Sequence, residues 1–355
     1  MKNVYRLDLI CIYCRHEIAT RDIDKEISCA NCGYLYPHIE VSKTSKVPPI
    51  IDMRLPEQVP TTEAAIVKSL LESYAHADYS RLTKIYLETI NTEKVPDHLV
   101  QHYKTYKLTA LNRGKQFANM FLKRLSAHFA IIDTNVALEL GCGSGAGMVA
   151  LANAFAHVVG LDPSLPNLIL AHKLCEESGI TTVQFVCAYG QKMPFADNSF
   201  DYVSAQNVLE HVFDADAVMI EIVRILNQKG CFVGDSRNRF DLFFPEPHVN
   251  LRWIGMLPRS WAAPYIRWRL DTAYNHTYLL SYWNLRKALH QGFGTQWQIV
   301  FPSTVTYGGK YGIDKILYAL EKFPFIAKPL LWIFPSHLAL AQKTVTQESI
   351  SSKVN

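Results

Sequence analysis

Short apolar runs alternate with helical patterns along the middle of the chain. Residues 136–140 and 157–161 are two such runs, a helical pattern at 146–156 separates them, and 182–186 is a third run. Apolar runs of this length, bounded by turn residues, are typical of strands buried on both faces. A strand, a helix and a second strand in this order form a βαβ unit. The pattern therefore predicts an α/β fold with parallel strands.

The segment before these strands has a different pattern. A proline-bearing linker at 47–60 is followed by residues 61–129, where apolar positions recur at helical spacing through Ile66, Leu70 and Tyr74. We expect helices there, which either lie over a binding site or form a structural packing layer.

A glycine-rich turn joins the first strand to its helix. Gly141, Gly143 and Gly145 allow the backbone to approach a ligand closely, because glycine has no Cβ. Asp162, at the end of the second strand, is placed to accept hydrogen bonds from both hydroxyls of a ribose. Glu139 directly precedes the turn, where it would repel a pyrophosphate and attract a cation. The residues favour a positively charged nucleoside over a dinucleotide, whose fingerprint has a GxGxxG spacing.

This E-x-G-x-G-x-G string with its spaced acid resembles the first motif of class I S-adenosylmethionine-dependent methyltransferases. Residues 191–212, QKMPFADNSFDYVSAQNVLEHV, resemble the LPF-x-x-x-x-FD signature of the UbiE/UbiG-like group (methyltransferase type 11), and 227–236 resemble its L-K-P-G-G turn and fifth strand. The resemblance covers about 135–236 in order. It implies a doubly wound, seven-stranded Rossmann-like sheet that binds S-adenosylmethionine.

The same resemblance implies further elements and site residues. It places Asn207 beside the transferred methyl group. It places Gln191 or the nearby backbone at the adenine, since residues 188–190 lack the acid that many relatives carry there. The remaining expected elements are a fourth strand from Phe200, helices at 215–226 and 282–291, and strands at 296–301 and 338–342.

Four of the eight cysteines form two C-x2-C pairs, Cys11/Cys14 and Cys29/Cys32. Two such pairs can place four thiolates tetrahedrally around zinc, which leaves no open position for catalysis. The pattern predicts a structural Zn²⁺ site, with iron or metal-free thiols as alternatives. Residues 33–37 resemble the end of zinc ribbons attached to methyltransferases. We expect Cys29→Ser to unfold such a ribbon without directly altering the cofactor pocket.

Composition and charge narrow the classes of protein. An apolar content of 49% over 355 residues supports a sizeable core and argues against disorder. The net charge of +4 gives little support to nucleic-acid binding, for which a clustered basic face is expected. No signal peptide is visible, and no uninterrupted apolar stretch reaches the roughly 18 residues of a membrane helix. We therefore expect a cytoplasmic protein without a transmembrane helix.

A long insertion at 236–280 follows the fifth strand. Its aromatic residues and arginines suit sugar rings, anionic head groups or a membrane interface. Loops at the carboxyl ends of strands build the pocket in this fold, so the insertion is expected to cap the acceptor. A second apolar insert lies at 323–335. The two inserts either form one face that touches the inner side of the membrane peripherally, or bury each other.

Two histidines are candidates for a general base. His211 follows the fourth strand and His248 lies in the insertion, and each could instead be a structural residue. Residues 207–211, NVLEH, also resemble an E-x-x-E-H motif through which some relatives bind a divalent metal. Asn207 replaces the first carboxylate of that motif, so no obligatory magnesium is expected.

Taken together, the sequence predicts a methyltransferase that acts on a small-molecule, glycan or lipid-linked acceptor, most simply at oxygen. A ribosomal-RNA base methyltransferase is the alternative, because bacterial guanine methyltransferases pair a zinc ribbon with this fold. A non-catalytic binding protein is the third interpretation. The expected organisation is a zinc ribbon at 1–46, a linker and helical segment at 47–129, a methyltransferase domain at 130–345 with its cap at 236–280, and a disordered tail at 346–355.

Overall fold

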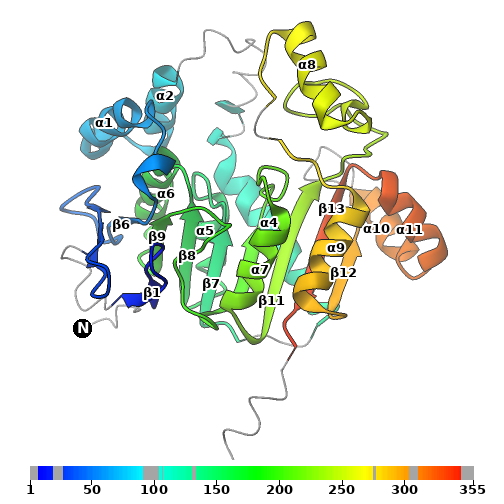
Figure 1. The fold of residues 1–355 in the computed structure, drawn as a ribbon, viewed down its shortest axis with the longest axis horizontal. Helices are drawn as coiled ribbons and strands as arrows, with labels where there is room; N and C mark the ends of the chain where they lie inside the picture. Colours follow the sequence, from blue (N-terminus) through cyan, green and yellow to red (C-terminus); the bar gives the residue numbers. More distant parts are fainter. Residues whose placement is uncertain are drawn as a thin grey trace, which may run out of the picture.

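A nine-stranded sheet forms the centre of the protein, in the order β12-β13-β11-β10-β7-β8-β9-β6-β5 (Figure 1). The computed structural model describes residues 7–18, 27–90, 104–105, 107–129, 133–274, 277–303 and 311–344. The seven expected strands are β7 (Val136–Leu140), β8 (His157–Asp162), β9 (Val183–Cys187), β10 (Phe200–Ala205), β11 (Leu226–Arg237), β12 (Trp297–Val300) and β13 (Ser336–Gln342). Strand β13 runs antiparallel to β11 and to β12, whereas β7 to β11 are parallel.

Two further strands extend the sheet beyond β9. Strand β6 (Ile50–Asp52) runs parallel to β9, and β5 (His38–Ile39) runs antiparallel to β6. The segment expected as a linker thus contributes a strand, and the end of the expected ribbon contributes another. Short strands of two or three residues are hard to distinguish from loops by periodicity, because they complete barely one alternation.

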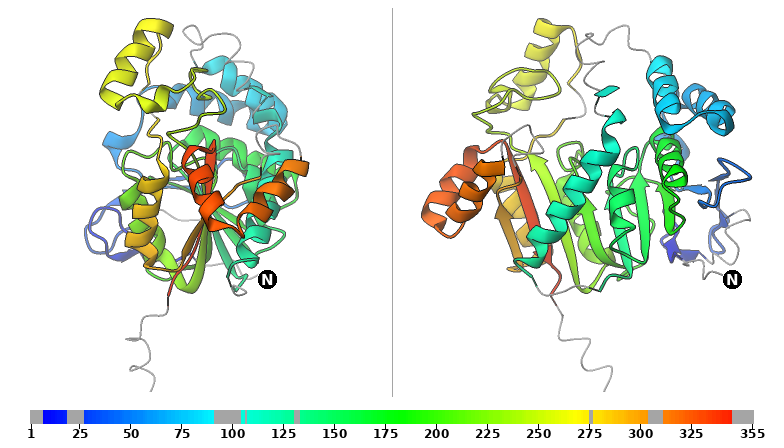
Figure 2. Two further views of the ribbon diagram at one scale, coloured as in Figure 1. Left: turned by 90° about the vertical axis from the view of Figure 1, so that its right-hand side faces the viewer. Right: turned by 180° about the vertical axis from the view of Figure 1, so that it is seen from behind.

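Helices cover both faces of the sheet (Figure 2). The elements of one face are α7 (Ala215–Ile225) and α9 (Tyr282–Phe293); those of the other are α4 (Ala110–Ser126), α5 (Ala146–Leu151) and α6 (Leu165–Glu177), over which α1 (Glu63–Ser73) and α2 (Tyr79–Thr89) pack. Helix α5 is shorter than the expected 146–156. Its end is marked by a tight turn in which Ala154 N donates to Leu151 O at 2.8 Å.

The cap and the second insert lie at the edge of the sheet where β11 ends (Figure 1). The cap contains the short helix η3 (Ile254–Met256) and α8 (Arg259–Leu270), and the second insert contains α10 (Tyr311–Leu320) and α11 (Pro324–Ile333). The cap has a small core of its own, formed by Val249, Ile254, Ala262, Ile266 and Tyr274. Among the described residues, no helix is long and apolar enough to cross a membrane. The expected disordered tail at 346–355 lies outside the described residues.

The N-terminal cysteine-bearing hairpins are β1 (Leu9–Ile10) with β2 (Glu17–Ile18), and β3 (Ile27–Ser28) with β4 (Leu35–Tyr36). They pack directly on the central domain. Ile10 N donates to Pro194 O at 3.0 Å, and Ala196 N donates to Asp8 O at 3.0 Å. Apolar side chains of the hairpins share one hydrophobic cluster with Phe195. The hairpins are therefore part of the main core on the α7 and α9 face.

Candidate functional site

The glycine turn after β7 has the open backbone that the sequence predicts. Gly141, Gly143 and Gly145 have φ values of 65°, 53° and 85°, which lie in the left-handed region that favours glycine. A Cβ added to Gly143 would meet no heavy atom within 4 Å, so a ligand can approach the backbone there. A Cβ added to Gly145 would lie 2.9 Å from the Cα of Ala171 in α6. Gly145 therefore serves helix packing, and Gly143 exposes the turn.

Asp162, at the end of β8, holds this turn in place. Its Oδ2 accepts a hydrogen bond from Gly143 N at 2.9 Å, and its Oδ1 accepts one from Ser164 N at 2.9 Å. Burial raises the pKa of Asp162. Each carboxylate oxygen has a second lone pair that can accept a further hydrogen bond. The side chain can therefore fix the loop and receive ribose hydroxyls together.

Glu139 is a buried carboxyl directly beneath the turn. It is 2% exposed, its Oε2 has no hydrogen-bond partner among the described residues, and burial, with a contribution from Asp162, raises its pKa to about 8. A Cβ on Gly147 would overlap the Glu139 carboxyl, so Gly147 belongs to the site as well. The sequence reasoning missed Gly147, although its place in the first turn of the helix was a usable signal.

The segment 207–211 lies against the glycine turn. A Cβ on Gly141 would overlap the side chain of Val208. Asn207 has a φ of 50°, and its N donates to Asp235 Oδ1 at 2.8 Å. Glu210 in the same segment is 1% exposed, and burial, with a contribution from Asp235, raises its pKa to about 8. The structure thus places the segment that contains Asn207 against the glycine turn.

Gln191 lies in the turn that follows β9. A Cβ on the preceding Gly190 would lie 3.1 Å from Leu140 Cδ1, which places this turn beside the end of β7. Tyr189 at the same turn donates from its hydroxyl to Gln58 O at 3.1 Å. The geometry brings Gln191 to the same edge of the sheet as the glycine turn.

Lys107 is a charged side chain near the site that the sequence reasoning missed. Its Nζ donates to Asn167 Oδ1 at 2.9 Å, and burial lowers its pKa to about 8 while the charge of Asp162 opposes this effect. Its backbone carbonyl accepts from the Tyr79 hydroxyl at 3.1 Å. Lys107 occurs in a segment without a motif, so no local pattern indicates that it folds back toward the end of β8.

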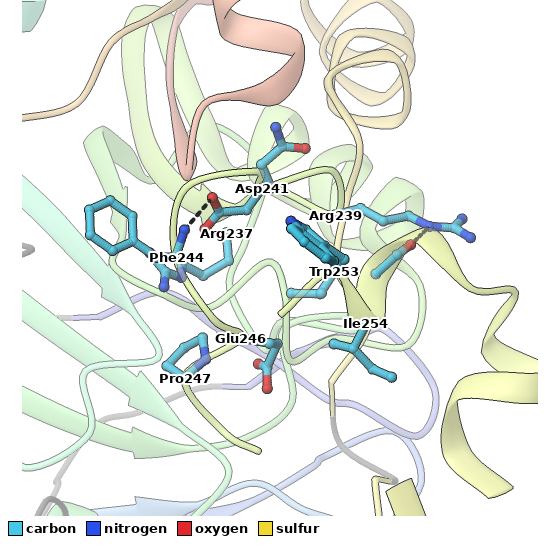
Figure 3. A pocket seen from close by; sticks show the side chains of 11 residues that line it. Arg237, Arg239, Asp241, Phe244, Glu246, Pro247, Trp253 and Ile254 are labelled. Atoms are coloured by element: carbon cyan, nitrogen blue, oxygen red, sulfur yellow. Dashed lines mark hydrogen bonds between the residues drawn. The ribbon is translucent and has the colours of Figure 1, made fainter. Parts of the chain in front are cut away.

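A pocket of about 290 Å³, including space open to solvent, lies where β11 enters the cap. Figure 3 shows Phe244 and Pro247 on one side of it and Trp253 and Ile254 on the other. Asp241 also lines the pocket, and burial raises the pKa of this carboxyl. The remaining lining residues are Arg237, Asn238, Arg239, Glu246, Gly255 and Leu279. The pocket combines apolar walls with charged groups of both signs.

The two candidate histidines meet at the base of the cap. The rings of His211 and His248 are edge to face, with centroids 4.9 Å apart and an interplanar angle of 90°. His248 Nδ1 is hydrogen-bonded to Glu246 Oε1, and Glu246 is a pocket residue. Sequence reasoning named both histidines but missed Glu246, two residues before His248.

The four cysteine thiols converge in the N-terminal hairpins. Their Sγ atoms all lie within 4.8 Å of one another, with Cys11 to Cys32 at 3.6 Å and Cys14 to Cys29 at 3.5 Å. A tetrahedral zinc with Zn–S bonds of about 2.3 Å requires Sγ atoms about 3.8 Å apart. The donor set and its spacing therefore fit a structural zinc ion. The two turns are alike, because Arg15 N donates to Cys11 O and Gly33 N to Cys29 O, each at 2.8 Å.

The residues around the glycine turn also fit S-adenosylmethionine. The open space at Gly143 lets the ligand approach the backbone of the turn. The unpartnered Oε2 of Glu139 suits the positive charge of the ligand. The remaining lone pairs of Asp162 can accept hydrogen bonds from its ribose hydroxyls. The seven strands from β9 to β12 follow the order of a doubly wound sheet. Among them only β13 is reversed, since it runs antiparallel to its neighbours β11 and β12. The fold and the arrangement of these residues are those expected of a class I methyltransferase domain.

Comparisons with known proteins support this class. The family described as a methyltransferase domain matches residues 138–234. The chain is 33% identical over 129 residues to a ubiquinone biosynthesis O-methyltransferase of Bradyrhizobium sp. (strain ORS 278), which covers 35% of this chain and 50% of that protein. It is 25% identical over 130 residues to the uncharacterized methyltransferase YcgJ of Bacillus subtilis, covering 37% and 49%. The chain spans about half the length of the curated relatives it matches. It contains a class I S-adenosylmethionine-dependent methyltransferase domain.

Solved structures of such proteins are also similar to this chain. A phosphoethanolamine N-methyltransferase 2 of Haemonchus contortus, in complex with S-adenosyl-L-methionine, aligns with a TM-score of 0.44 and 17% identity over 65% of this chain and 53% of that one. The YcgJ structure aligns with a TM-score of 0.40 and 16% identity over 64% and 99%.

Proposed function

We propose that this protein transfers the methyl group of S-adenosylmethionine to a hydroxyl of an acceptor bound beneath the cap. The proposal rests on a contact between the segment beside the glycine turn and the cap. The segment 207–211 packs on the glycine turn through Val208, and its His211 meets His248 of the cap. The segment that borders the cofactor loop therefore also contacts the cap. The acceptor is a small molecule, a glycan or a lipid-linked compound.

When bound, S-adenosylmethionine supplies the methyl group and a good leaving group, so the protein mainly orients the reactants. Glu139 and Asp162 hold the cofactor, and His211 or His248 accepts the acceptor's proton. The test is transfer of radiolabelled methyl from S-adenosylmethionine to RNA, lipid and polysaccharide fractions of a deletion strain. Label in lipid or polysaccharide supports the proposal, and label in RNA supports the ribosomal alternative. Folded protein that binds no S-adenosylhomocysteine refutes both.

The carboxyl of Glu139 makes cofactor affinity depend on pH. Its pKa of about 8 means that it is mostly protonated near pH 6.5, whereas a bound sulfonium and ammonium favour the carboxylate. Binding should therefore release a proton, and affinity should rise by at most about tenfold per pH unit up to pH 8. In the cofactor-free protein the same raised pKa lowers stability as pH rises from about 4.5 to 8.

Calorimetry in buffers of different ionisation enthalpy measures the released proton. Glu139→Gln should remove it, and Glu210→Gln is the matched control, since Glu210 is a second buried carboxyl with its pKa raised to about 8. If Glu210→Gln abolishes the effect while Glu139→Gln does not, Glu139 is not the group that faces the cation.

We further propose that the cap touches an anionic membrane surface. Trp261 and Trp268 of α8 are 68% and 80% exposed, and Phe325 of α11 is 93% exposed. No acid occurs between 247 and 270 or between 322 and 343, whereas both segments carry arginine or lysine. The inserts do contact each other, for example through Phe243 and Phe334, with ring centroids 6.3 Å apart. This contact leaves Trp261, Trp268 and Phe325 exposed to solvent. Exposed aromatic side chains beside basic residues are typical of helices that lie at a membrane interface.

Co-sedimentation with vesicles tests this surface. Vesicles of phosphatidylcholine with phosphatidylglycerol should bind the protein at low salt, and pure phosphatidylcholine should bind it weakly. Arg267→Glu and Trp268→Ala should reduce binding, since each basic residue near an anionic surface contributes about 1 kcal/mol. The control is Ile220→Ala, an exposed apolar residue of α7. Protein that remains in the supernatant under all conditions contradicts the membrane contact.

We propose that Cys11, Cys14, Cys29 and Cys32 bind one structural zinc ion. The convergence of their Sγ atoms within 4.8 Å supports this assignment.

A further inference from the structure

We propose that Glu246 and His248 form a carboxylate–imidazole pair, supplied by the cap, that accepts the acceptor's hydroxyl proton. His248 is the catalytic residue of the pair and Glu246 is its positioning residue. The inference rests on the proposed methyl transfer and deepens it, because it selects one of the two histidines as the base and names the group that orients it.

The carboxylate of Glu246 is held by several bonds at once. Oε1 is hydrogen-bonded to His248 Nδ1, and Oε2 accepts from His248 N at 2.9 Å and from Val249 N at 3.0 Å. The backbone of Glu246 is fixed as well, because its N donates to Leu251 O at 2.9 Å and its O accepts from Asn250 N at 2.7 Å. The residue is 7% exposed. Such a buried, fully engaged carboxylate can move little and so fixes the imidazole.

This contact determines which ring nitrogen of His248 is basic. A carboxylate accepts hydrogen bonds, so it selects the tautomer with the proton on Nδ1 and leaves the lone pair on Nε2. As the acceptor oxygen bonds to the methyl carbon, the carbon–sulfur bond breaks and sulfur keeps its electron pair. The hydroxyl proton passes to Nε2 of His248. The resulting imidazolium lies against the Glu246 carboxylate, which stabilises its charge.

The pair lies where such a base is needed. The His248 ring meets the His211 ring edge to face, and His211 belongs to the segment that packs on the glycine turn through Val208. Glu246, which is hydrogen-bonded to the His248 ring, lines the cap pocket. The imidazole therefore contacts both the segment that packs on the cofactor loop and a carboxylate that lines the pocket. His211 packs against it and limits its rotation.

The tautomer of His248 can be measured without knowing the acceptor. Long-range ¹H–¹⁵N spectra of the full chain with bound S-adenosylhomocysteine should show neutral His248 protonated at Nδ1. In Glu246→Gln the side-chain amide can donate to Nδ1, so the proton should move to Nε2. Asp241→Asn changes another pocket acid and should leave the tautomer unchanged. His290, whose Nδ1 bonds Gly294 O at 2.8 Å, is an internal reference.

Activity on the labelled fraction provides the second readout. His248→Ala should lower the transfer rate by roughly 10²–10⁴-fold, and Glu246→Gln by at least about tenfold, with affinity for S-adenosylhomocysteine unchanged. Wild-type protein with His248 protonated at Nε2, or Glu246→Gln with an unchanged tautomer, overturns the inference even if methyl transfer is confirmed. Failure to bind S-adenosylhomocysteine instead refutes the proposed function itself.

Discussion

Replacing Cys29 with serine is expected to lower the free energy of unfolding by several kcal/mol and to weaken cofactor binding as well. Structural zinc contributes about 10–16 kcal/mol of apparent binding free energy in isolated zinc fingers, and much of that energy is folding energy. Here the hairpins share their hydrophobic cluster with Phe195, so their loss exposes the main core. The damage should therefore spread beyond the hairpins.

Loss of the hairpins should affect the cofactor site through the segment 193–196. It pairs with β1, and Arg15 Nη1 donates to Met193 O at 3.1 Å. The turn that contains Gln191 directly precedes this segment. This pairing changes the expectation from sequence, in which the cofactor pocket was not directly affected, because the sequence does not show which strand edge the hairpins contact.

Elemental analysis, urea unfolding and calorimetry with S-adenosylhomocysteine measure the three effects. Cys231→Ser is the matched control, a buried thiol of β11 outside the cluster that should leave one equivalent of zinc in place. Arg15→Ala should keep the zinc but weaken the docking contact. Anaerobically purified wild-type protein that is stable and free of metal would contradict the prediction.

Much of the fold could be predicted from local pattern. The strands at 136–140 and 157–161 are apolar, of ordinary length and separated by a glycine turn, and the structure has them at β7 (Val136–Leu140) and β8 (His157–Asp162). Strand β6 could not be predicted in this way, because three residues between prolines carry almost no periodicity. Its place beside β9 is decided by tertiary pairing.

In the candidate site, too, the local contacts could be predicted from the sequence and the long-range contacts could not. Glu139 and the glycines follow one another in sequence, so their geometry is local and could be predicted. Lys107 reaches the site through the folding of a distant segment, and no spacing in the sequence reports its place near Asp162. For Glu246, a carboxylate two residues before a candidate base was the usable signal.

Asp162→Ala should weaken binding of S-adenosylhomocysteine by about tenfold to a hundredfold or more. The substitution removes the proposed ribose acceptor and leaves Gly143 N and Ser164 N without the carboxylate that accepts from them at 2.9 Å each. An unpaired buried group costs about 1–3 kcal/mol, and each 1.4 kcal/mol is a factor of ten in affinity. Asp201→Ala is the matched control, because this buried acid accepts from Val136 N at 3.0 Å at the opposite end of β7. Asp201→Ala should lower the stability of the protein and leave its affinity for S-adenosylhomocysteine nearly unchanged.

An analogue of S-adenosylhomocysteine that lacks a ribose hydroxyl tests the contact directly. The wild type should bind this analogue more weakly than S-adenosylhomocysteine, whereas Asp162→Ala should bind the two ligands about equally. Equal losses in both proteins would show that Asp162 shapes the glycine turn without contacting the ribose.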